Sequence, residues 1–65
     1  SNDLALTYHK LQNDKRCLEL LQPYAEDAGK NEAEIRDSYL PSEADSWLPV
    51  LKATRTNLRL CKGGK

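Results

Sequence analysis

Helix-terminating residues divide this chain into three main segments, and their positions constrain the fold more than any other feature. Pro23 ends the first segment, because a proline inside a helix lacks an N–H group and clashes with the preceding turn. Gly29 follows a short turn near 23–28, Leu40-Pro41 ends the second segment, and Gly63-Gly64 closes the third. The sequence therefore predicts an all-α domain with three main helices, over about 3–21, 31–39 and 43–62.

The first segment has a heptad pattern of apolar residues. Leu4, Leu11, Leu18 and Ala25 are spaced by seven residues, and Tyr8 widens the same stripe. This spacing is typical of one face of an amphipathic helix. We expect one long first helix that can also pack against another chain.

Side chains that cap helices mark the start of the other two segments. Asn31 followed by Glu34 has the form of a capping box and predicts a helix from about residue 32. Ser42 and Asp45 repeat that spacing, which places the start of the last helix near Glu43. A break near 52–54, which would divide this last helix into two, is the alternative form.

The core that such a chain can build is thin. A chain of 65 residues buries only about 60% of its unfolded surface. Apolar residues make up 38% of the sequence, which contains no Phe and no Met. We therefore expect partner-assisted folding, with a dimer or a stable hetero-complex at micromolar concentration in sedimentation equilibrium. The candidate interface residues are Leu4, Tyr8, Leu11, Leu18 and Trp47.

Two cysteines, Cys17 and Cys61, leave three interpretations open. The favoured one makes them small core residues in a reducing, intracellular and cytoplasmic compartment. The second is a disulfide that ties the first helix to the last. The least favoured is a metal site that also uses His9, the single histidine. Because the spacing fits no zinc motif, we expect no metal and no cofactor.

Charge is distributed unevenly along the chain. Residues 1–45 hold ten acidic and five basic residues, whereas residues 46–65 hold five basic residues and no acidic one. On a single helix the cations of the last segment follow a 3-4-3 spacing along one side: Lys52, Arg55, Arg59 and Lys62. The row is either a binding surface for an anionic group or a solvated face whose cations favour the helix C-terminus.

The stretch KATRTNL, residues 52–58, resembles the turn and the start of the recognition helix of a helix-turn-helix over 44–62. Trp47, Leu51, Ala53, Leu58 and Cys61 would fill its apolar positions, and Thr54 would cap the second helix. The resemblance implies that Arg55, Thr56, Asn57, Arg59 and Lys62 are free to contact DNA, whereas Lys52 stands where the turn usually has glycine. The candidate residues for binding a partner or a nucleic acid are Lys52, Arg55, Asn57, Arg59 and Lys62.

The absence of catalytic motifs favours a non-enzymatic protein. No nucleophile motif surrounds any Ser or Cys, and no Gly-rich phosphate loop is present. The first choice is a small protein–protein interaction module, with self-association as one form, and the alternative is a small DNA-binding domain. Neither a membrane nor a small-molecule substrate is expected as a partner. Ser1-Asn2 is a candidate expression scar, in which case the chain is a fragment or a processed product.

Overall fold

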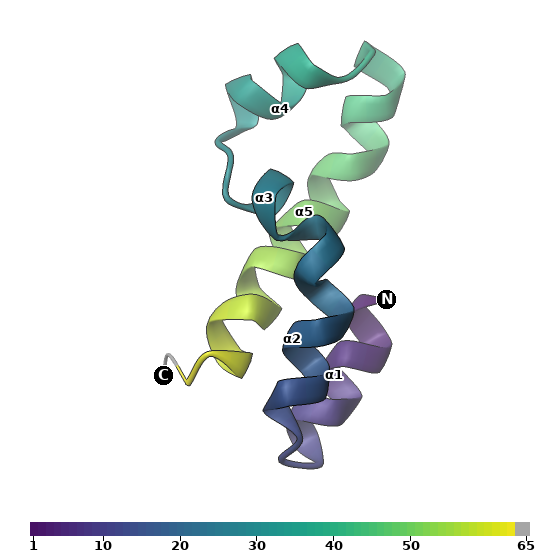
Figure 1. The fold of residues 1–65 in the computed structure, drawn as a ribbon. Helices are drawn as coiled ribbons and strands as arrows, with labels where there is room; N and C mark the ends of the chain where they lie inside the picture. The colour runs from purple at the N-terminus through teal and green to yellow at the C-terminus, as the bar shows by residue number, and fades with distance from the viewer. Residues whose placement is uncertain (64–65) are drawn as a thin grey trace.

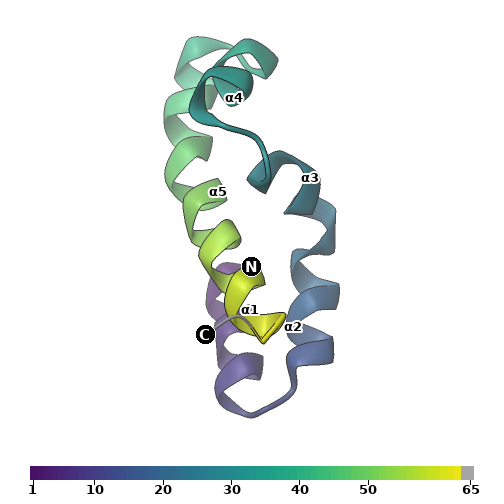
Figure 2. The same ribbon diagram turned by 90° about the vertical axis from the view of Figure 1, so that its left-hand side faces the viewer.

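The structure, a computed structural model, describes residues 1–63 and confirms the all-α fold. These residues form helices and no strand. The elements, in chain order, are α1 (Asn2–Lys10), α2 (Asp14–Leu21), the short 3-10 helix η1 (Gln22–Tyr24), α3 (Ala25–Ala28), α4 (Glu32–Ser38) and α5 (Pro41–Cys61). The other α-helices all pack against α5 (Figure 1). In Figure 2, α2 and α3 run beside α5, and α4 lies near its N-terminal end.

The first segment is two helices, so the expected single helix over 3–21 is wrong. Gln12, at the corner between α1 and α2, has a φ of 62°. Its N–H group donates to the His9 carbonyl at 2.9 Å, and the N–H group of Asn13 donates to the Tyr8 carbonyl at 2.8 Å. This pair of bonds is the Schellman motif that ends many helices. Asn13 then caps α2 with its side chain, so the corner is closed on both sides.

The second predicted helix is confirmed as α4, together with its capping box. Asn31 Oδ1 accepts from the backbone N–H of Glu34 at 2.9 Å. Glu34 Oε1 accepts from the backbone N–H of Asn31 at 3.0 Å. The helix ends at Ser38, just before the predicted Leu40-Pro41 boundary.

The third predicted helix is confirmed as α5, with two differences. It begins at Pro41, slightly before the expected start, because proline suits the first helical turn and Glu43 accepts from the Leu40 N–H at 3.1 Å. It also continues through 52–54 without the break of the alternative form. Residues 44–61 are therefore a single helix, and the turn of a helix-turn-helix does not form there.

The end of α5 agrees with the predicted glycine stop. Gly63 has a φ of 83°, a conformation that glycine adopts at helix ends without strain. Gly64, the second glycine of that stop, lies outside the described residues. Charged side chains recur along α5, and within residues 1–63 none of the helices is long and apolar enough to cross a membrane.

The buried face of α5 is a mostly apolar stripe along the helix. Leu51, Thr54, Leu58 and Cys61 are buried, and Trp47 is half-buried at the other end of the stripe. This face meets small or aliphatic side chains from each of the other α-helices, namely Ala5, Cys17, Leu21, Ala28 and Ile35. Most of the core therefore depends on α5.

Candidate functional site

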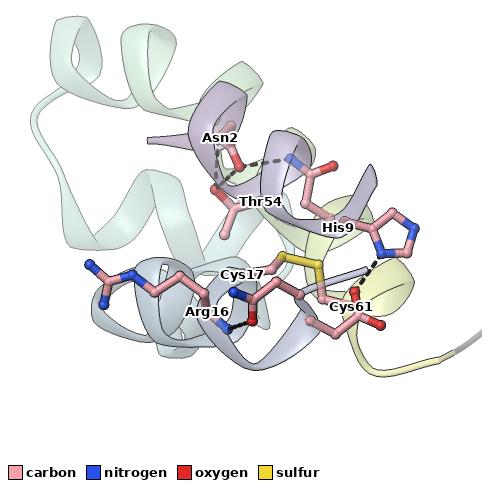
Figure 3. Close-up of a disulfide and its surroundings, with 9 residues drawn as sticks. Asn2, His9, Arg16, Cys17, Thr54 and Cys61 are labelled. Atoms are coloured by element: carbon pink, nitrogen blue, oxygen red, sulfur yellow. Dashed lines mark hydrogen bonds and ion pairs between the residues drawn. A yellow bond between two sulfur atoms is a disulfide. The ribbon is translucent and has the colours of Figure 1, made fainter. Parts of the chain in front are cut away.

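A disulfide between Cys17 of α2 and Cys61 of α5 closes one end of the molecule (Figure 3). The favoured interpretation, two separate reduced thiols, is therefore wrong in this structure, and the second one is correct. Both cysteines are buried, and their Cα atoms lie 6.3 Å apart. Lasting disulfides are typical of oxidising compartments, so the cytoplasmic setting expected from the sequence loses its main support.

The four predicted cations are exposed along α5 and at its C-cap: Lys52, Arg55, Arg59 and Lys62. Arg55 is partly committed within the fold. Its Nε donates to the Ala28 carbonyl at 2.8 Å, and its Nη2 donates to the Lys30 carbonyl. Arg55 therefore fastens the C-terminal end of α3 to α5, because free carbonyls at a helix end need donors.

Asn57, the fifth predicted binding residue, does not join the row of cations. It is buried, and its Nδ2 donates to Asn2 Oδ1 at 3.1 Å. The Asn2 side chain in turn bonds Thr54 and the Val50 carbonyl, which links the first turn of α1 to α5. Asn57 is therefore a structural residue, and it is not free to reach an adenine base as the helix-turn-helix resemblance implies.

A surface groove of about 430 Å³ lies between α3 and the C-terminal half of α5. Its apolar floor comes from Ala25, Ala28, Gly29 and Leu58, and its cationic wall from Arg55, Arg59 and Lys62. The small side chains of α3 leave this space unfilled, and the exposed cations lie along its edge. We call this cavity the α3–α5 groove.

A second, smaller cavity of about 210 Å³ lies on the α4 side of Arg55, which lines both cavities. Ile35, Leu48 and Leu51 line it together with Lys52. Because Glu32 also lines this cavity, the lining carries charges of both signs. The α3–α5 groove, with three cations and no acidic lining residue, is the better match for an anionic group.

Sequence reasoning identified the cations of the groove and missed its floor. Ala25, Ala28 and Gly29 are far from α5 in the sequence, and only the fold brings them there. Their spacing of three and four residues places them on one helical face, which is the one signal that the sequence offered.

The five predicted interface residues do not form one surface. Leu4 and Leu11 are exposed, by 47% and 70%, whereas Tyr8, Leu18 and Trp47 pack partly against the core. The corner at Gln12 interrupts the heptad stripe, so its leucines do not share a helix face.

Trp47 lies in an aromatic cluster near the middle of the molecule. Its ring is 6.3 Å from that of Tyr39, in a stacked arrangement, and also 6.3 Å from that of Tyr24. It lines a third cavity, of about 360 Å³, together with Val50 and Tyr24. Trp47 therefore has both a packing role and an accessible edge.

Asp27, Lys30 and Tyr39 form a hydrogen-bonded cluster beside this aromatic group. The Tyr39 hydroxyl donates to Asp27 Oδ2 at 2.6 Å, and Lys30 Nζ lies 3.0 Å from Asp27 Oδ1. The bond from Tyr39, followed by that from Lys30, holds the pKa of the Asp27 carboxyl below its ordinary value. The bond to Asp27 also raises the pKa of Tyr39 and that of Lys30.

Replacing Tyr39 by phenylalanine is expected to raise the pKa of Asp27 toward its ordinary value, because it removes the largest cause of the shift. Since the folded pKa of Asp27 lies below the unfolded value of about 3.9, its contribution to stability is present above that value. The contribution is lost as the pH falls through the folded pKa. A carbon-detected NMR titration of the Asp27 carboxyl in both proteins measures the shift.

Tyr24→Phe is the matched control, because it removes a hydroxyl from the same aromatic cluster without touching Asp27. Equal Asp27 pKa values in the wild type and in Tyr39→Phe would contradict the assignment.

No family model matches the chain, and neither a curated protein nor a solved structure matches it.

Proposed function

We propose that this chain is a non-enzymatic protein–protein interaction module whose α3–α5 groove binds an acidic segment of a protein partner. One observation carries the proposal: a single groove combines an apolar floor with exposed cations from α5 and its C-cap. An apolar side chain of the partner would enter over Leu58, and neighbouring carboxylates would pair with Arg59 and Lys62.

The size and chemistry of the groove support an occupant of this kind. A volume of about 430 Å³ lies within the range of ordinary ligand pockets, which are mostly apolar with a few polar groups that set orientation. Burial of an apolar side chain supplies affinity at about 25 cal/mol per Å². Charge complementarity at the rim supplies specificity and a faster encounter.

The test begins with selection of peptides from a displayed random library on the immobilised, oxidised protein. The selected peptides are expected to carry acidic residues next to a bulky apolar one. Arg59→Glu combined with Lys62→Glu is expected to weaken the binding of a selected peptide roughly tenfold or more. Each reversal replaces an exposed attraction by a repulsion of similar size. Isothermal titration calorimetry measures the loss, and amide shifts of Ala28 and Leu58 report whether the groove is occupied.

The control variant combines Lys10→Glu with Lys15→Glu. Both lysines are exposed, on α1 and α2, and neither lines the groove. This control makes the same change in net charge and should leave affinity nearly unchanged. An equal loss in both double variants, or selected peptides without acidic residues, would contradict the proposal.

Nucleic acid remains the competing anionic partner from the sequence interpretation. Residues 44–61 form one helix, and Asn57 is buried, so the DNA-reading geometry of a helix-turn-helix is not available. The remaining interaction would be with phosphates through exposed cations. Titration with random duplex DNA at about 50 mM salt tests it, because phosphate contacts strengthen at low salt. If the protein binds this DNA at low salt, and if the Arg59→Glu and Lys62→Glu changes remove the binding, the result would favour nucleic acid over a protein partner.

Binding to a second copy of this chain is the alternative to binding a different protein. Leu4, Val50 and Tyr24 are exposed and offer apolar surface. The disulfide stabilises the thin core without a partner, so a dimer is less necessary than the sequence suggested. Sedimentation equilibrium over the micromolar range separates a folded monomer from a dimer.

A further inference from the structure

Three side chains that can bind a metal meet where α1, α2 and α5 come together, and a fourth adjoins them. The ligand atoms of His9, Asp14 and Cys61 all lie within 4.8 Å of one another. Nδ1 of His9 is 2.7 Å from Oδ1 of Asp14. Cys17 brings a second sulfur, because it is bonded to Cys61. Figure 3 shows His9 beside the disulfide.

In the oxidised protein the two sulfurs are bonded to each other, and neither is a thiolate. The thiolate is the form of cysteine that binds metal. Reduction by a dithiol changes this: the disulfide accepts two electrons and two protons and becomes two thiols, while the reductant forms its own disulfide. Both thiols then lie next to an imidazole and a carboxylate.

We propose that reduction of the Cys17–Cys61 disulfide creates a site for one Zn²⁺ ion. Its four ligands are Cys17 Sγ, Cys61 Sγ, a ring nitrogen of His9 and a carboxylate oxygen of Asp14. Two thiols, one imidazole and one carboxylate form a donor set that suits tetrahedral zinc. The two thiols release their protons to solvent as the metal–sulfur bonds form.

The largest movement that the geometry needs is the separation of the two sulfurs after reduction. Zinc–ligand distances of about 2.0–2.3 Å place tetrahedral ligand atoms about 3.3–3.8 Å apart. The two sulfurs would separate to that distance, and His9 and Asp14 would open from 2.7 Å by less than an ångström. The pairs that His9 and Asp14 each form with Cys61 already lie within 4.8 Å. Cys17 Sγ, which is bonded to Cys61 Sγ in the oxidised protein, would move to complete the set.

The surroundings fix the ligands and leave a way in for the metal. Both cysteines are buried, whereas the side chains of His9 and Asp14 are 31% and 43% exposed. The Schellman corner at Gln12 holds the end of α1 against the start of α2, which sets His9 facing Asp14. A metal ion bound by both sulfurs would replace the disulfide as the link between α2 and α5. This end of the bundle would then stay closed in either redox state.

Titration with Co²⁺, a spectroscopic substitute for Zn²⁺, tests the proposal. The protein is reduced with a phosphine, which leaves no competing thiol in solution. We expect one equivalent to give the visible absorption of tetrahedral Co²⁺ and thiolate-to-metal charge transfer, and Zn²⁺ to displace it. The oxidised protein should show neither. Circular dichroism is recorded in parallel: where reduction lowers the helical content, one equivalent of Zn²⁺ should restore it.

Variants separate a folded site from simple binding by two thiols. His9→Gln and Asp14→Asn, each first confirmed as folded in the oxidised state, are expected to weaken Co²⁺ binding roughly tenfold or more. Asp37→Asn, an exposed acidic residue on α4, is the matched control and should have no effect. The proposal fails if the reduced protein does not bind Co²⁺, if His9→Gln binds as tightly as the wild type, or if Zn²⁺ does not restore lost helix.

Discussion

Reduction of the Cys17–Cys61 disulfide is expected to lower the free energy of unfolding by about 4 kcal/mol in the presence of a metal chelator. The two cysteines are 44 residues apart, and opening a loop of that length restores conformational freedom to the unfolded chain. The chain-entropy relation gives about 4 kcal/mol for a loop of this size. For a domain of this length the loss is a large fraction of its total stability.

Urea denaturation of the same protein, oxidised and reduced, measures this difference. The chelator is needed because a bound metal would replace the lost link. Reoxidation should return the transition to its original midpoint, which controls for irreversible damage. Coincident transitions in the two redox states would contradict the prediction and would mean that the packing of α5 alone holds the fold.

Replacing Asn2 by alanine is expected to lower the free energy of unfolding by about 2 kcal/mol. Its side chain bonds Thr54 and Asn57, which are only 1% and 8% exposed. Without Asn2, the Asn57 amide loses this partner in a place where water has little access, and an unsatisfied buried donor costs about 1–3 kcal/mol. The first turn of α1 also loses its polar contacts with α5. Thermal or urea denaturation of the oxidised protein measures the effect.

Gln22→Ala is the control, because Gln22 is exposed and its side chain makes no described hydrogen bond that could be lost. It should change stability by no more than about 0.5 kcal/mol. A double-mutant cycle with Asn57→Ala gives a second check. The two losses should not add, since each substitution removes the same hydrogen bond.

Local signals explain why parts of the fold could be predicted from the sequence. Asn31 and Glu34 satisfy each other's backbone groups, so their spacing alone locates the start of α4. The corner between α1 and α2 could not be predicted in this way. Gln12 occupies a left-handed position that usually takes glycine, and the sequence there continues an apolar helical period. Packing of α1 beside α2 and α5 outweighs that local preference.

The site was predictable only to the extent that it lies on one helix. The spacing of Arg59 and Lys62 predicted that both are exposed on one side, and the structure has both exposed, Arg59 on α5 and Lys62 at its C-cap. The role of Arg55 as a donor to the carbonyls of Ala28 and Lys30 depends on contacts 27 and 25 residues away in the sequence. The ligand cluster of His9, Asp14 and Cys61 likewise depends on tertiary contacts and matches no linear zinc motif.

The dependence of the core on α5 has a consequence for biosynthesis. Helices α1 to α4 emerge first from the ribosome, and α5 carries the face against which each of them packs. At synthesis rates of about 5–20 residues per second, the 21 residues of α5 take about one to four seconds to follow. During that interval Cys17 has no native disulfide partner, because Cys61 is the last residue of the helix. Completion of the fold is therefore delayed until translation has passed Cys61, and a chaperone or an oxidoreductase would meet Cys17 as a free thiol.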